Sequence, residues 1–317
     1  MVICIGEVLF DLISDQPGAV LEDVTVWIPY PGGAPANVAC GVRRLGIESA
    51  FIGGVGDDRL GSELVTTLES EGVDRTGIQR INDYPTRSVL VTRSLAGDRS
   101  FAAFSENRSS DCFADTRLNA EKLPLELLRS ASYLVTGTLG LASSDTAQAI
   151  HRAIDIVKKS GGMIVTDLNW RSVFWPDFDS AQVPIQAILA KTDLLKLTDD
   201  EAELFFNTVD PVVIHNIFPN LNGILLTRGD AGCAYWIAGH SGECPAFDVA
   251  VQDTTGAGDA FLAGFLSQHS NRSLTDATSI QLAIRYASAA GALTTLKRGA
   301  IVALPTSVEI EAFLRDR

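Results

Sequence analysis

The chain has 317 residues, of which 46% are hydrophobic and 20% charged, so a sizeable core is expected and disordered or fibrous classes are excluded. Its formal net charge of −14 argues against a surface for nucleic acid or anionic membranes, because such a surface needs a basic patch. A nucleotide site is compatible with this charge, since a site can be locally positive.

The chain opens on an apolar run, MVICIGEVLFDLI, which carries two carboxylates and no basic start. This pattern favours a strand over a signal peptide. Further strands are predicted from short apolar runs, and helices from apolar residues that recur on one face. In chain order we predict strand Val2–Ile5, helix Pro35–Leu45, strands Ala50–Val55 and Tyr133–Thr136, helix Thr146–Lys159, and strands Met163–Thr166, Leu194–Leu197 and Ile224–Thr227.

Several of these strands are continuous apolar runs, as is typical of strands buried on both faces of a parallel sheet. Strand–helix alternation predicts an α/β fold, with a central, mostly parallel sheet flanked by helices. No run of about eighteen apolar residues occurs, so no membrane span is expected. Five cysteines, an odd number without a C-x-x-C pair, indicate reduced thiols and a cytoplasmic location.

Two segments, Leu12–Tyr30 and Thr86–Phe104, lack a helical period and are predicted to form antiparallel strands. The second contains a hairpin turn near Ala96-Gly97-Asp98. A small sheet of this kind, beside a cleft, would form a lid. We therefore expect residues 1–11, 32–85 and 105–317 to form the α/β core, and residues 12–31 and 86–104 to form a β lid.

The most informative stretch is DTTGAGDAF, from Asp253 to Phe261, between a strand-like run at 245–252 and a predicted helix. Small residues let backbone approach a ligand closely, and a helix N-terminus offers unpaired N–H groups and a positive dipole end. Together they predict an anion site suited to phosphate. Asp259 lies in this turn, where a carboxylate either caps the helix or accepts a proton from an attacking hydroxyl. No Walker A pattern is present, so a P-loop protein is excluded.

Two motifs carry a family resemblance. DTTGAGDAF resembles the C-terminal signature of the PfkB (ribokinase-like) carbohydrate kinases, and GGAPANVA at 32–39 resembles that family's sugar-binding turn. The resemblance extends from Ile5 to about Pro305. It implies a ribokinase-like fold in which the α/β core binds nucleotide and sugar beside a β-sheet lid. It also implies a kinase that uses ATP and Mg²⁺, with a small-molecule sugar as acceptor. It also implies activation by K⁺ and a homodimer through the lid, as many members show.

The resemblance implies roles for individual residues at the sugar and the phosphate. These are Asp259 as the catalytic base, Gly256, Ala257 and Gly258 as the anion hole, and Asp11, Gly33, Asn37 and Arg171 as sugar ligands. For three of them a plainer interpretation stays open. Asp11 would also suit a turn after a strand, Asn37 the start of a helix, and Arg171 a surface ion pair.

Nucleotide and metal ligands are implied in the same way. They are Asn169, Thr227, Gly229, Gly232 and Ser288 for the nucleotide, Glu201 for Mg²⁺ through water, and Asp253 for K⁺. Thr198 stands where the family usually has Asn before this glutamate, and glutamate is ordinary in a first helical turn. The run TRGDAG at 227–232 would also suit a plain β-turn, and the small residues around Ser288 would suit helix packing.

The identity of the sugar rests on further resemblance. The runs at 293–300 and 303–306 resemble fructokinases and, together with Arg171, favour D-fructose as substrate and fructose 6-phosphate as product. A 2-keto-3-deoxygluconate kinase is the alternative, because Arg171 would pair with a carboxylate. Another PfkB sugar kinase also remains open, as does a non-catalytic relative that binds or regulates. The intact GAGD run argues against the non-catalytic relative.

Overall fold

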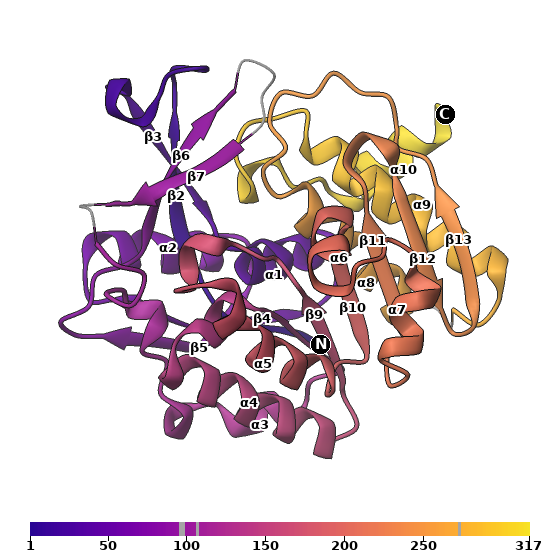
Figure 1. Ribbon diagram of the computed structural model, residues 1–317, viewed down its shortest axis with the longest axis horizontal. Coiled ribbons are helices and arrows are strands. Elements are labelled where there is room, and N and C mark those ends of the chain that lie inside the picture. The colour runs from indigo at the N-terminus through magenta and orange to yellow at the C-terminus, as the bar shows by residue number, and fades with distance from the viewer. Residues whose placement is uncertain (95–98, 106–107, 272–273) are drawn as a thin grey trace.

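The computed structural model describes residues 1–94, 99–105, 108–271 and 274–317. Among these residues, nine strands form one sheet in the order β13-β12-β11-β10-β9-β8-β1-β4-β5 (Figure 1). Neighbours from β11 to β5 are parallel, and β12 and β13 add an antiparallel edge. The strands are β1 (Val2–Ile5), β4 (Ser49–Gly56), β5 (Asp74–Ile81), β8 (Tyr133–Gly137), β9 (Met163–Asp167), β10 (Leu194–Thr198), β11 (Gly223–Thr227), β12 (Cys233–Ile237) and β13 (His240–Cys244). The predicted central, mostly parallel sheet is confirmed.

Helices cover both faces of this sheet, because side chains alternate between two hydrophobic cores along each strand. In β1, Val2 and Cys4 join one core, and Ile3 and Ile5 join the other. The first core includes residues of α1 (Ala34–Arg44), α2 (Arg59–Ser70), α8 (Ala257–Asn271), α9 (Ala277–Thr294) and α10 (Ser307–Arg315). The second includes residues of α3 (Leu125–Arg129), α4 (Ser144–Lys159), α5 (Phe178–Leu189), α6 (Asp199–Phe206) and α7 (Pro211–Ile217). In the part of the chain that the structure describes, no helix is both long and apolar enough to cross a membrane.

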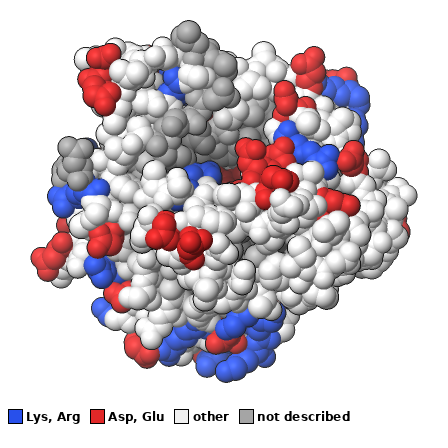
Figure 2. Space-filling view, viewed as in Figure 1, with Lys and Arg blue, Asp and Glu red and all other residues white. Residues whose placement is uncertain are grey.

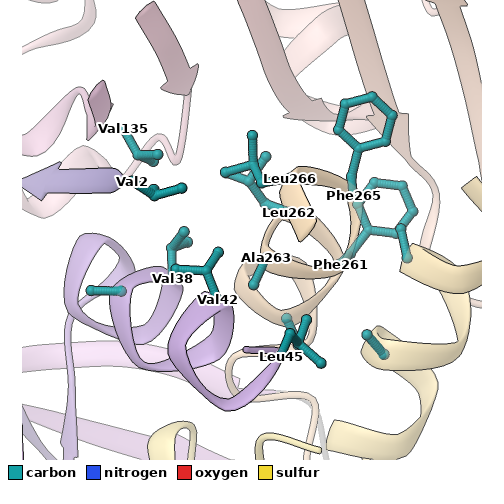
Figure 3. Packing of buried hydrophobic residues seen from close by; sticks show 14 of the residues in the cluster. Val2, Val38, Val42, Leu45, Val135, Phe261, Leu262, Ala263, Phe265 and Leu266 are labelled. Carbon is teal, nitrogen blue, oxygen red and sulfur yellow. The ribbon is translucent and has the colours of Figure 1, made fainter. Parts of the chain in front are cut away.

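The packing of α1 against α8 sets the position of the two motif-bearing turns. Figure 3 shows Val38 and Val42 of α1 facing Leu262 and Ala263 of α8 over the sheet. A Cβ built on Gly41 would lie 2.7 Å from the Cβ of Ala263, so glycine is needed for the helices to approach this closely. The N-terminal turns of α1 and α8 are thereby held side by side.

A second, smaller sheet of four strands within the described residues projects from the main body (Figure 1). Its order is β3-β2-β6-β7, with β2 (Leu9–Ser14), β3 (Trp27–Gly32), β6 (Ser88–Arg93) and β7 (Arg99–Phe104). The β2–β3 and β6–β7 pairs are antiparallel as predicted, but β2 and β6, which join them, are parallel. The predicted turn at Ala96-Gly97-Asp98 lies outside the described residues. The division of the chain into core and lid stays a prediction.

Two details of the sequence prediction were wrong. The strand-like run at 245–252 forms no regular strand, because the chain leaves the sheet edge after Cys244. Its aromatic residue, Phe247, packs on Phe313 of α10 instead, with ring centroids 5.0 Å apart. Strands β5, β12 and β13 were not predicted; polar and charged residues interrupt β5 and β13, whereas β12 is the short apolar run CAYWI.

Candidate active site

The turn before α8 is fixed by a buried carboxylate. One oxygen of Asp253 accepts hydrogen bonds from the N–H (3.0 Å) and the hydroxyl (2.5 Å) of Thr255, and the other accepts from the N–H of Gly299 (2.9 Å). Gly256 adopts a φ of 75°, and a Cβ there would lie 2.8 Å from the Cβ of Ala300. The turn therefore requires glycine and leads directly into the N-terminus of α8, where the first N–H groups have no carbonyl of the same helix to bond, although that of Ala257 donates to the carbonyl oxygen of Thr254 at 3.2 Å. That is the geometry expected of an anion site.

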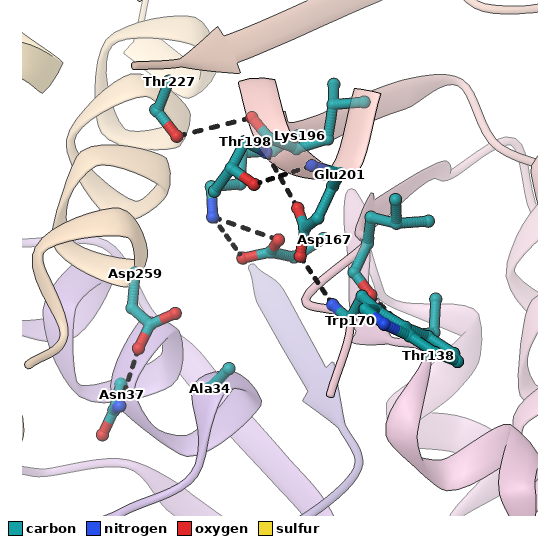
Figure 4. Close-up of polar contacts among 12 residues, drawn as sticks. Ala34, Asn37, Thr138, Asp167, Trp170, Lys196, Thr198, Glu201, Thr227 and Asp259 are labelled. Carbon is teal, nitrogen blue, oxygen red and sulfur yellow. Dashed lines mark hydrogen bonds and ion pairs between the residues drawn. The ribbon is translucent and has the colours of Figure 1, made fainter. Parts of the chain in front are cut away.

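Asp259 lies in the first turn of α8 and is buried. Its carboxylate accepts a 2.7 Å hydrogen bond from the amide Nδ2 of Asn37, a residue of α1 that is 222 positions away (Figure 4). Burial and the nearby Asp167 raise the pKa of Asp259, while Lys196, Asn37 and Arg171 partly offset the increase. A carboxylate with a raised pKa is suited to accept a proton from a hydroxyl.

The glycine pair before α1 brings Asp11 close to Asn37. A Cβ on Gly32 would lie 2.8 Å from Oδ2 of Asp11 and 4.0 Å from Oδ1 of Asn37. Gly33 has a φ of 103°, and a Cβ there would lie 2.6 Å from the carbonyl oxygen of Glu7. The Oδ1 atom of Asn37 is buried and has no hydrogen-bond partner among the described residues. A buried polar atom of this kind is a natural contact for a polyhydroxyl ligand.

Lys196 is the site residue that sequence reasoning missed. It lies in β10 and is buried, with Nζ 3.0 and 3.1 Å from the two carboxylate oxygens of Asp167 (Figure 4). A Cβ on Gly258 would lie only 2.8 Å from this Nζ, so the cation touches the proposed anion hole. Burial opposes the charged form, but Asp167, Glu201 and Asp259 outweigh it and raise the pKa of Lys196. A lysine inside the apolar run Leu194–Leu197 was the available signal.

Glu201 is buried and joins α6 to the loop after β9. Its Oε2 accepts a 2.8 Å bond from the N–H of Thr198 in a capping box, and its Oε1 accepts a 2.6 Å bond from the N–H of Trp170. Thr198 replaces the usual asparagine without loss of the cap, because its hydroxyl accepts from the Glu201 N–H at 3.2 Å. Burial, with a contribution from Asp167, raises the pKa of Glu201, and Lys196 opposes this.

The donor set around Glu201 fits a hydrated metal better than direct ligation. No group of three His, Cys, Asp or Glu side chains in the described ranges is arranged to hold a metal ion. Both oxygens of Glu201 already accept backbone N–H groups, and their remaining lone pairs suit water molecules. Mg²⁺ in nucleotide sites keeps several waters and takes its other ligands from phosphate.

Asn169 and Arg171 follow β9 in a strained loop. Asn169 adopts a left-handed φ of 42°, which asparagine tolerates better than most residues. Arg171 is half-buried and donates from Nη1 to the carbonyl oxygen of Trp170 at 2.6 Å. Its charge also lowers the pKa values of Asp259 and Glu201, so its guanidinium lies near both carboxylates.

An open cleft of about 530 Å³ lies beside these residues, which is within the usual size of small-molecule sites. Acidic side chains gather over α6 at this part of the surface (Figure 2). Four of the predicted site residues line this cleft, namely Arg171, Glu201, Thr227 and Gly229.

Three predicted nucleotide contacts, Asn169, Gly232 and Ser288, do not line this cleft. Gly232 has a φ of 90° and closes the turn after β11, since its carbonyl accepts from the Arg228 N–H at 2.7 Å. The hydroxyl of Ser288, on α9, lies 3.8 Å from the sulfur atoms of both Cys233 and Cys244.

Comparison with known proteins decides the family. Residues 1–307 match the pfkB family of carbohydrate kinases. The chain belongs to this family. Fructokinase-1 of Zea mays is 36% identical over 315 residues, which covers 98% of this chain and 96% of that protein.

Solved structures of similar proteins superpose on nearly the whole chain. Fructokinase from Xylella fastidiosa with bound ATP has a TM-score of 0.88 and 29% identity, covering 99% of this chain and 98% of that one. A fructokinase double mutant from Vibrio cholerae O395, in a fructose-, ADP- and potassium-bound form, has a TM-score of 0.85 and 27% identity, covering 99% and 97%. An E. coli structure in complex with ATP and Mg²⁺ has a TM-score of 0.88 and 28% identity, covering 100% and 99%. The predicted ribokinase-like fold is confirmed.

Proposed function

We propose that this carbohydrate kinase transfers the terminal phosphoryl group of ATP to D-fructose and forms fructose 6-phosphate. The observation that supports the mechanism is the hydrogen bond from Asn37 of α1 to Asp259 of α8, because it joins the residue proposed to bind the sugar to the residue proposed as the base. The relatives named fructokinase, one of them with fructose and ADP bound, support fructose as the acceptor.

In this proposal Asp259 accepts the proton of the attacking sugar hydroxyl as the new O–P bond forms. Asp11, Gly33, Asn37 and Arg171 hold the sugar. The N–H groups of Gly256, Ala257 and Gly258 stabilise the charge that develops on the transferred phosphoryl group. Lys196 adds a fixed positive charge beside Gly258 and keeps Asp167 paired.

The nucleotide and its ions take the other side of the site. We assign Asn169, Thr227, Gly229, Gly232 and Ser288 to the nucleotide, Glu201 to Mg²⁺ through water, and Asp253 to K⁺. Mg²⁺ supplies neutralisation of phosphate charge when it is bound with ATP. The potassium ion in the Vibrio cholerae structure supports the K⁺ assignment. Asp253 itself orders the α8 turn through Thr255 and Gly299, so an ion there would act on the anion hole.

Three broader features belong to the same proposal. The small sheet closes over the sugar as a lid and excludes water that would hydrolyse ATP. A homodimer forms through this sheet, where β3 and β7 are the edge strands. The protein works in the cytoplasm, which is consistent with cysteines that are free in the structure.

One observation favours a second substrate. Arg171 lies close enough to Asp259 to act on its pKa, so its guanidinium would also suit a sugar acid such as 2-keto-3-deoxygluconate. The test is ATP consumption by the purified protein, with Mg²⁺ and K⁺, in the presence of fructose, ribose, glucose, 2-keto-3-deoxygluconate or adenosine. We expect fructose to stimulate turnover far above the others. Stimulation by the sugar acid alone would replace the proposed substrate, and no stimulation by any sugar would favour a non-catalytic relative.

A further inference from the structure

Two cysteines lie opposite each other at the edge of the central sheet. Cys233 begins β12, Cys244 ends β13, and the antiparallel register pairs them directly. Directly opposed residues of an antiparallel pair have Cα atoms about 4.5–5.5 Å apart and side chains on one face. A disulfide needs Cα atoms about 4.4–6.8 Å apart. The pair can therefore be bridged without separating the strands.

The two thiols are already polarised by their surroundings. A hydrogen bond from Cys233 outweighs burial and, with Ser288 and Arg285, lowers the pKa of Cys244 to about 6. The same hydrogen bond raises the pKa of Cys233. The shared hydrogen bond thus favours the thiolate form of Cys244 and the protonated form of Cys233, which is the asymmetry of a reactive dithiol. By contrast, Cys4 and Cys40 are fully buried and burial raises their pKa values.

We propose that Cys233 and Cys244 form a reversible disulfide with hydrogen peroxide as the oxidant. The Cys244 thiolate attacks one peroxide oxygen and becomes a sulfenic acid, and the departing hydroxide takes up a proton to give water. The sulfur of Cys233 then attacks the sulfenic sulfur, loses its proton, and a second water leaves. Two thiols lose two electrons, and these reduce peroxide to two waters. A dithiol reductant reverses the step by thiol–disulfide exchange.

The bridge would act on the nucleotide side of the site, and this part rests on the proposed function. A Cβ on Gly232 would collide with the carbonyl oxygen of Cys244, so this turn sits directly on the end of β13. Ser288 Oγ contacts both sulfur atoms. Bringing the two sulfur atoms to bonding distance would shift the Cys244 carbonyl that packs on Gly232, and it would change the contacts of the Ser288 hydroxyl. We expect the KM for ATP to rise about five- to tenfold, the equivalent of one lost hydrogen bond, with the KM for fructose unchanged.

Mass spectrometry of the whole protein tests the bond independently of activity. Trypsin releases both cysteines in the peptide 229–272, which is expected to lose the mass of two hydrogen atoms after peroxide treatment. Cleavage after Glu243 separates the two cysteines, and only a disulfide keeps the fragments joined. Dithiothreitol is expected to restore the original mass. A peptide that stays reduced while the more exposed Cys112 is oxidised would overturn the proposal.

Three variants assign the kinetic effect. Cys233→Ser and Cys244→Ser are expected to keep a constant KM for ATP under peroxide, whereas the control Cys112→Ser responds like the parent chain. A disulfide that forms without a change in this KM would refute the link to the nucleotide site. If the reduced protein phosphorylates no sugar and the disulfide still forms, the modification site stands and the proposed function fails.

Discussion

The proposed acceptor half of the site, around Asn37 and Asp259, and the proposed nucleotide half, around Glu201 and Ser288, use their polar groups differently. In the acceptor half, Asn37 donates to Asp259 and keeps a buried oxygen without a partner among the described residues. In the nucleotide half, both oxygens of Glu201 accept backbone N–H groups and the Ser288 hydroxyl contacts two thiols. Side chains are thus expected to meet the sugar directly, whereas the nucleotide is expected to meet backbone, water and metal.

The largest effect is expected from removing the base. Asp259→Asn keeps the shape of the side chain but cannot take up a proton, so turnover should fall about a thousandfold or more while the KM for fructose stays within a few-fold. Steady-state kinetics at saturating ATP measure both constants. Asp276→Asn is the matched control, because Asp276 caps α9 through the N–H groups of Thr278 and Ser279. Near-normal turnover of Asp259→Asn would mean that Asp259, like Asp276, only caps its helix and is not the catalytic base.

The next effect tests whether Lys196 belongs to the acceptor half. Lys196→Met leaves Asp167 buried without its ion-pair partner, which is expected to cost about 3–5 kcal/mol of unfolding free energy. Turnover should fall about a hundredfold, since a fixed charge beside the anion hole is lost.

A double variant separates stability from catalysis. Lys196→Met with Asp167→Asn removes both charges, so the free energy of unfolding, measured by urea denaturation, should return towards the parent value while turnover stays low. Recovery of turnover together with stability would mean that Lys196 serves only to neutralise Asp167.

A smaller effect, confined to sugar affinity, is expected at Asp11. Asp11→Ala removes a buried carboxylate beside the glycine turn, so the KM for fructose should rise about tenfold while turnover changes less. Asp15→Ala is the control, because Asp15 is exposed near the end of the same strand and pairs with Arg298. An equal KM for fructose in the two variants would show that Asp11 does not bind the sugar.

The sequence predicted the acceptor half better than the nucleotide half, for a physical reason. Glycines at 33 and 256 are required by positive φ values and by close contacts, and these constraints leave a readable motif. Asp259 and Asn37 were placed correctly in helical first turns because such turns follow those glycines. Whether each residue performs its assigned role remains a prediction.

Long-range pairing was much harder to predict. The Asp167–Lys196 ion pair joins two strands, and neither run shows which partner the other will meet. Ser288 was chosen from small residues that let a base slide along a helix, but its hydroxyl faces two thiols from another part of the chain.

The smallest effect on turnover is expected at Glu7, whose consequence is for stability. Glu7 lies beside the turn that begins α1, with Oε1 accepting from the Ala34 N–H at 3.2 Å and Oε2 buried without a partner among the described residues. Burial, helped by the nearby Asp115, raises the pKa of Glu7 from 4.5 to about 8.

The folded state therefore holds a proton that the unfolded chain releases above its ordinary pKa. The stabilisation is complete below about pH 4.5 and is lost as the pH rises towards 8. Glu7→Gln cannot ionise, so its unfolding free energy should depend less on pH than that of the parent chain. Urea denaturation across this range measures the difference, with the exposed Glu22→Gln as control. Parallel pH profiles for Glu7→Gln and the parent would show that Glu7 is already ionised in the fold, and that the acceptor half holds one more charge than its burial suggests.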